Sequence, residues 1–188
     1  TAILIGWANA SFWSLSPVWG SRISYSPSQV AAFMTATIIG CAAGQLPAGY
    51  VGDKYGRRTV LGVMAAVAML GSIAIAIIPG RYAAMIIGFV IGITMPTLYV
   101  MCSAHANDRA GPNHVVEVSS SVLFLYCIGA FIGPVFAAIM MEQHGAQALY
   151  WHNAAIYGLI LVYVIIRARI SPAPVQLPEA EPEPVRIK

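Results

Sequence analysis

The sequence predicts an all-α membrane protein made of six transmembrane helices, and three observations support this fold class. Apolar residues make up 59% of the 188 residues, and charged residues make up only 9%, against about a quarter in an ordinary soluble domain. The mean hydropathy is +0.74, so the chain needs lipid as its solvent. A spanning helix uses about 20 residues. Six such helices with short loops therefore fill nearly the whole chain and leave no room for a soluble domain.

Polar segments that contain glycine or proline divide the chain into six apolar stretches. The predicted spans cover residues 2–20, 29–51, 59–78, 82–104, 116–141 and 148–166. Ser26 or Ser28 is placed to cap the second span, and the breaker pair at 79–80 closes the third. These spans form one domain, residues 1–170. Residues 171–188 hold five prolines and three glutamates, a composition typical of a disordered tail.

The basic residues are divided unequally between the two ends of the predicted bundle. With six spans, Arg22 and Arg81 fall on one side, and all other basic residues fall on the opposite side: Lys54, Arg57, Arg58, Arg109, Arg167, Arg169, Arg186 and Lys188. Cytoplasmic loops carry an excess of Lys and Arg. We therefore expect the larger group, both ends of this segment and the tail to be cytoplasmic.

Several classes of partner and cofactor are not expected. The net charge of +3 is small, and no basic stretch with interleaved aromatic residues suggests a nucleic-acid partner. Cys41, Cys102 and Cys127 lie in three different apolar segments without a CxxC pair, so we expect buried thiols at helix contacts and no metal centre or redox pair. No cofactor is predicted.

Small residues and prolines recur inside the predicted spans. The pairs with GxxxG spacing are Gly40 with Gly44, Gly88 with Gly92, and Gly129 with Gly133. Such pairs let helix backbones approach closely in lipid. Prolines lie within the spans at Pro17, Pro47, Pro96 and Pro134, where each removes a backbone hydrogen bond. They predict kinks, which are either hinges or parts of a static shape.

A charged loop follows the second span and reads GYVGDKYGRR over residues 49–58. Gly56 permits a tight turn between two antiparallel helices. Asp53 closes the second helix, where its carboxylate is unfavourable beside the negative end of that helix. It therefore needs another partner, such as Arg57 or the positive N-terminus of a neighbouring helix.

This loop resembles the signature loop of the major facilitator superfamily (MFS) of transporters. The matching residues are Gly49, Val51, Asp53, Lys54, Gly56, Arg57 and Arg58. The loop falls between the second and third helices of a six-helix half, as in that family, and on the side that the charges assign to the cytoplasm. The resemblance covers residues 2–166. It implies one MFS half, with the C-terminal half favoured by the tail and the missing initial methionine, and the N-terminal half as the alternative.

The resemblance also implies roles for the loop residues. Asp53 and Arg57 would form a conformational gate that latches the cytoplasmic side against the opposite half. We assign Gly49, Asp53, Lys54, Gly56, Arg57 and Arg58 to this gate motif. The alternative is that the basic residues of the loop only fix the topology. The resemblance further implies a location in the plasma membrane, the inner membrane of a bacterium.

In this family the substrate cavity lies between the two halves, and the first and fourth helices of each half line it. The candidate lining residues are Asn9, Trp13, Ser16, Met95, Tyr99 and Tyr126, with Gln45 and Ser119 as lesser candidates. Asn9, Trp13 and Ser16 share a helix face, and an amide facing lipid is costly, so we expect Asn9 to face the interior. The alternative is that Asn9 bonds a neighbouring helix and Trp13 packs in the core.

His105, Asp108 and Glu117 could form a cytoplasmic polar cluster, with loop solvation and helix capping as the alternative. The stretch 105–109 also resembles a bacterial branch of the superfamily. No Asp or Glu lies at the centre of a span, so either the other half supplies a proton-coupling acid or transport is not proton-driven.

The predicted function is transport of a small solute by alternating access. The expected partners are the lipid bilayer, the other six-helix half and a small-molecule substrate. Two alternatives stay open, an intramembrane enzyme and a non-transporting sensor on the same scaffold. An enzyme is not favoured, because the spacing of the His and acidic residues matches no metal motif.

Overall fold

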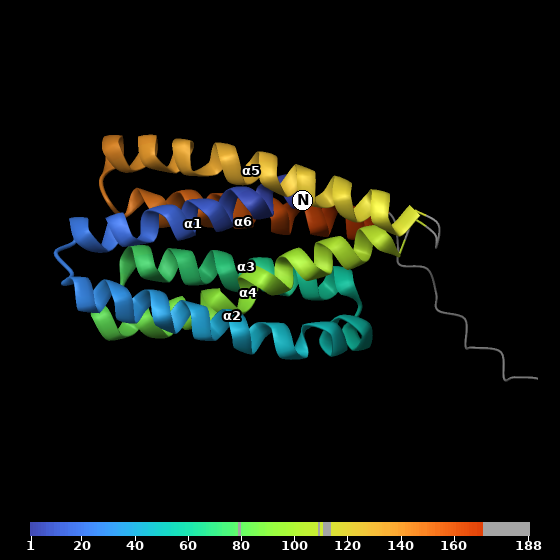
Figure 1. The fold of residues 1–188 in the computed structure, drawn as a ribbon, viewed down its shortest axis with the longest axis horizontal. Helices are drawn as coiled ribbons and strands as arrows, with labels where there is room; N and C mark the ends of the chain where they lie inside the picture. Colours follow the sequence, from blue (N-terminus) through green and yellow to red (C-terminus); the bar gives the residue numbers. More distant parts are fainter. Residues whose placement is uncertain (79, 109, 111–113, 171–188) are drawn as a thin grey trace, which may run out of the picture.

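The described part of the chain folds into six α-helices and contains no strand (Figure 1). The structure is a computed structural model, and it describes residues 1–78, 80–108, 110 and 114–170. The helices are α1 (Ala2–Arg22), α2 (Pro27–Tyr55), α3 (Arg57–Ile77), α4 (Arg81–Asn107), α5 (Val115–His144) and α6 (Ala148–Ile170). The predicted all-α fold class is confirmed. The predicted tail, 171–188, lies outside the described residues, and so does Arg109.

The helix ends follow local sequence chemistry. Helix α2 begins at Pro27, two residues earlier than the predicted span, because Ser26 is its N-cap. The Gln29 N–H donates to Ser26 Oγ at 3.3 Å, and the Ser26 N–H donates to Gln29 Oε1 at 2.8 Å. This reciprocal capping box satisfies two backbone donors at the helix start. Of the two serines considered, Ser26 is therefore the cap.

Two helix pairs approach each other at backbone distance, and glycines make this possible. A methyl group added at Gly40 or Gly44 of α2 would overlap the carbonyl oxygens of Phe89 or Ile93 of α4. One added at Gly92 of α4 would overlap the backbone of α2 in return. The predicted close packing at these small-residue pairs is confirmed.

The α1–α5 pair is built in the same way. A methyl group at Gly129 would overlap the carbonyl oxygen of Ile3, and one at Gly133 would overlap that of Trp7. From the other side, Gly6 of α1 lies against the backbone of Tyr126. Without a hydrophobic driving force between helices in lipid, such backbone contacts supply much of the packing energy.

The remaining helices join the two pairs into one bundle. Helices α3 and α6 pack on each other, α3 also packs on α4, and α6 also packs on α1. Figure 1 shows α6 partly covered by α1, and α4 crossing in front of α3. The helices run along the long axis of the molecule, so the loops gather at its two ends.

Five of the described helices, α2 to α6, are long and apolar enough to cross a membrane. Helix α1 is not among them, because its sequence contains an asparagine and four serines. Its polar residues Asn9, Ser11 and Ser16 are buried inside the bundle. These polar side chains are therefore shielded from lipid by helices such as α4, α5 and α6, which pack on α1. The predicted intrahelical prolines lie inside α1, α2, α4 and α5.

Candidate functional site

The charged loop forms a one-residue turn between α2 and α3, at what we call the motif end of the bundle. Gly56 alone separates the two helices and has φ +82°, a conformation that costs other residues about 1–2 kcal/mol. The Lys54 ammonium lies 5.6 and 5.5 Å from the ring centroids of Tyr50 and Tyr55. The exposed Lys54 side chain thus lies beside two tyrosine rings of its own helix.

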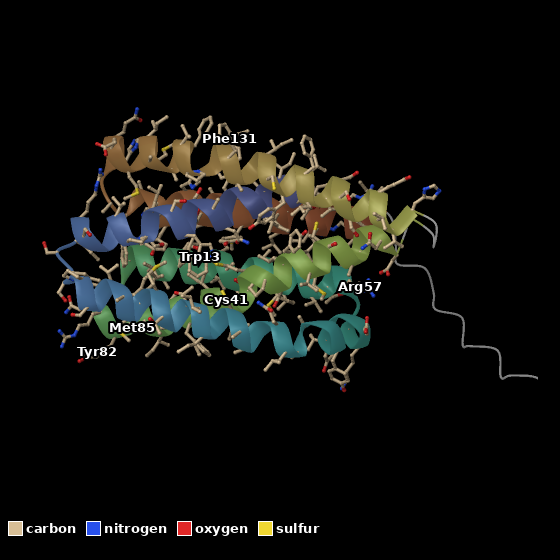
Figure 2. The ribbon with its side chains drawn as sticks, in the orientation of Figure 1. Trp13, Cys41, Arg57, Tyr82, Met85 and Phe131 are labelled. Atoms are coloured by element: carbon tan, nitrogen blue, oxygen red, sulfur yellow. The ribbon has the colours of Figure 1, made fainter. Side chains whose placement is uncertain are left out.

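Arg57, which Figure 2 shows at the motif end, joins two carboxylates. Its Nη1 donates to Asp108 Oδ1 at 2.8 Å, and its Nη2 donates to Asp53 Oδ1 at 3.4 Å. Arg57 is therefore the partner that was predicted for the Asp53 carboxylate. The bond to Asp53 is the longer one, and the Asp53 side chain is 71% exposed. Its carboxylate keeps acceptor capacity for a further donor.

The other loop residues face different surroundings. Arg58 donates from Nη1 to the carbonyl oxygen of Arg167 at 3.2 Å, which ties the start of α3 to the end of α6. Gly52 is buried, and a methyl group there would overlap the sulfur of Met101. Gly49, in contrast, has no described atom within 4 Å of an added methyl group. The loop therefore has one packed face and one open face.

The predicted cytoplasmic polar residues lie near the motif end with different partners. Asp108 pairs with Arg57, whereas Glu117 Oε2 lies 3.0 Å from His114 Nδ1. His105 lines a cavity of about 270 Å³ at the motif end. Asn107 and Ser119 exchange side-chain hydrogen bonds of 2.9 and 3.2 Å, which join α4 to α5. In the described part of the chain, no three His, Cys, Asp or Glu side chains are grouped to hold a metal ion.

A central cavity of about 350 Å³ opens between α1, α2, α4 and α5. Its lining residues are Asn9, Trp13, Cys41, Gln45, Met95, Pro96, Tyr99, Leu123 and Tyr126. Figure 2 shows Trp13 and Cys41 at the middle of the bundle length, from facing helices. The structure therefore brings together five of the six cavity candidates, together with Gln45.

Ser16 is the candidate that does not line this cavity. It is fully buried, and its Oγ lies 3.2 Å from the Tyr150 hydroxyl of α6. Cys41 was missed by sequence reasoning, which placed the first and fourth helices at the cavity. Its spacing of four residues from Gln45 puts both on one face of α2, and this pattern could have identified it.

The polar wall of the cavity is held by hydrogen bonds between helices. Asn9 Nδ2 donates to the Tyr126 hydroxyl of α5 at 3.4 Å, and the Tyr157 hydroxyl of α6 donates to Asn9 Oδ1 at 3.4 Å. The Tyr99 and Tyr126 rings meet edge to face at 5.2 Å between centroids. Asn9 therefore bonds to neighbouring helices, as the alternative had it, and also lines the cavity.

The opposite end of the bundle carries its own ion pair. Arg22 at the end of α1 pairs with Glu142 near the end of α5, and its Nη1 donates to the Met141 carbonyl oxygen at 3.1 Å. Within the bundle, Trp7 Nε1 donates to His152 Nε2 at 2.9 Å and so joins α1 to α6.

Comparison with known proteins gives a consistent result. The family model of the Major Facilitator Superfamily matches residues 1–187. The chain is 30% identical over 167 residues to an "uncharacterized MFS-type transporter" of Yersinia pestis, which covers 89% of this chain and 42% of that protein. It is 28% identical over 173 residues to such transporters of Enterobacter sp. and Escherichia fergusonii, covering 92% of this chain and 44% of each relative. The chain thus spans less than half the length of these relatives. It is a multi-pass membrane protein, and it belongs to the major facilitator superfamily.

Proposed function

We propose that this chain is one half of a secondary transporter that moves a small solute across the membrane by alternating access. The observation that carries the proposal is the central cavity, which places polar side chains at the middle of apolar helices. Polar groups at that depth are costly in lipid and mark solute pathways. Membership of a transporter family favours transport over an intramembrane enzyme or a sensor.

The second half would cover the face that holds this cavity. Leu46 of α2 is 88% exposed and follows the cavity residue Gln45 directly in sequence. Transporters of this kind bind substrate at the interface of two repeats, and the relatives are more than twice as long as the matched segment.

The charged loop would act as the gate at the motif end. Among the described residues, Asp53 is held only by the longer bond to Arg57, so its carboxylate can accept a bond from the other half. The open space beside Gly49 leaves room for a helix of that half. In this proposal the motif end and both ends of this segment are cytoplasmic, in the inner membrane of a bacterium, as the excess of basic residues at that end favours.

The gate is tested with Asp53→Asn, which keeps the shape of the side chain and removes its charge. The readout is the rate at which a membrane-impermeant maleimide alkylates Cys41 from the motif side, in a background where Cys102 and Cys127 are serine. An exposed ion pair contributes up to about 1 kcal/mol, so we expect labelling to rise about two- to fivefold. Glu142→Gln, at the opposite end, is the matched control. An unchanged rate for Asp53→Asn would remove the gate from the proposal.

A further inference from the structure

The polar groups around the central cavity divide into two sets. Asn9 and Tyr126 are bonded to each other, and Asn9 also accepts from Tyr157. Asn9 is only 6% exposed. These groups hold the wall of the cavity, and their main hydrogen-bonding capacity is already used within the protein.

The second set has no hydrogen-bond partner in the described part of the chain. It comprises the Trp13 indole N–H of α1, the Gln45 carboxamide of α2 and the Tyr99 hydroxyl of α4, and all three side chains line the cavity. An unsatisfied polar group at membrane depth costs several kcal/mol. Water, a solute or a group of the other half would supply the missing bonds, and the three side chains come from three different helices that line one cavity.

The cavity lining also limits the charge of what it can hold. None of its nine lining residues is Asp, Glu, Lys, Arg or His. A buried charge without an opposite partner is strongly unfavourable. The Trp13 face can attract a cation weakly, but no carboxylate of the described residues lines the cavity to neutralise one. This half of the cavity wall therefore favours an uncharged occupant.

The same lining offers an aromatic surface of fixed orientation. The Trp13 ring is packed edge to face against Phe12, at 5.7 Å between centroids and 83° between planes. The space of about 350 Å³ suits one small molecule. We propose that this half recognises an uncharged organic solute with a ring, which stacks on Trp13 and exchanges hydrogen bonds with Gln45 and Tyr99. This inference rests on the proposed transport function and names the class of its substrate.

The test uses three probes that share one aromatic group and differ in charge. They are para-nitrophenyl glucoside, which is uncharged, para-nitrophenyl phosphate, and para-nitrobenzyl trimethylammonium. Binding to the full-length protein is measured by quenching of tryptophan fluorescence. We expect the glucoside to bind more tightly than both charged probes. Binding of none of them, or of a charged probe at least as tightly, overturns the proposal.

Variants assign the binding to the three groups. Gln45→Leu should weaken glucoside binding about tenfold, because one bonded polar partner is lost, while Gln143→Leu at the exposed end of α5 should leave it unchanged. Gln45→Glu keeps the side-chain size and should shift the preference to the cationic probe, which separates a lost contact from a lost fold. Equal binding by the wild type and Gln45→Leu overturns the assignment.

The failure of this inference can be told apart from a failure of the transport proposal. Alkylation of Cys41 from both sides of the membrane reports alternating access without any solute. If Cys41 is reached from both sides but the uncharged probe has no preference, transport stands and the solute class falls. If the uncharged probe binds as expected but Cys41 is reached from one side only, the solute class stands and alternating access falls.

Discussion

The close contact between α1 and α5 can be tested by a single methyl group. In Gly129→Ala the new Cβ would overlap the carbonyl oxygen of Ile3, which is backbone and cannot rotate away. Helices α1 and α5 must then separate, which also loosens the contact at Gly133. Overpacking of this kind costs about 1–3 kcal/mol. Replacing glycine by alanine inside a helix stabilises it by about 0.5–1 kcal/mol. The net loss in the free energy of unfolding is therefore smaller than the cost of the overlap alone.

The matched control is Gly158→Ala in α6, where an added methyl group lies 3.4 Å from the Met69 sulfur, an ordinary van der Waals contact. In the control, the substitution should raise the free energy of unfolding by about 0.5–1 kcal/mol, because alanine is more stable than glycine inside a helix. The two variants should therefore differ by about 1–3 kcal/mol. For a chain of this size that is a difference of roughly 3–10 °C in melting temperature, measured by thermal unfolding in detergent. Equal melting temperatures would refute the backbone contact between α1 and α5.

Three further substitutions test local features. Ser26→Ala should lower the free energy of unfolding by about 1 kcal/mol through loss of the capping box, and Ser28→Ala should have a smaller effect, as thermal unfolding will show. Gly56→Ala should cost about 1–2 kcal/mol because of its positive φ, and a melting temperature equal to that of the wild type would contradict the one-residue turn. Tyr157→Phe removes the donor to Asn9 and should cost about 0.6 kcal/mol, an average for such bonds in membranes. A change of more than a few kcal/mol would mean that this hydroxyl has a role beyond that single bond.

The bundle could be predicted because its determinants are local. Runs of apolar residues define the helices, and Ser26 caps α2 through Gln29, three residues away. The glycine pairs are recognised by their own four-residue spacing, although the backbone that each pair contacts lies on a helix distant in sequence. The pairing of Arg57 with Asp53 is also local, since four residues separate them. Asp108 could not be foreseen as the second partner of Arg57, because 51 residues separate the two and only the packing of α4 brings it there.

The cavity was predicted in part for a similar reason. Helical spacing places Asn9, Trp13 and Ser16 on one face, but that face is wider than the cavity. Ser16 lies at the border of this face and points toward α6, where its hydroxyl contacts the Tyr150 hydroxyl. Periodicity reports which face of a helix is polar, whereas the neighbour that each side chain meets depends on how the helices cross. Cys41 was missed because the signal for it is its four-residue spacing from Gln45, which was itself only a lesser candidate.

The central claim is that the cavity belongs to a transporter that opens to the two sides of the membrane in turn. The most direct measurement is alkylation of wild-type Cys41 by an impermeant maleimide in right-side-out and in inside-out vesicles, read by mass spectrometry of the peptide. Cys41 lines the cavity and is half-buried. Our account predicts that the reagent reaches Cys41 from both sides. Labelling from one side only, under conditions where exposed control cysteines react on both, would contradict it.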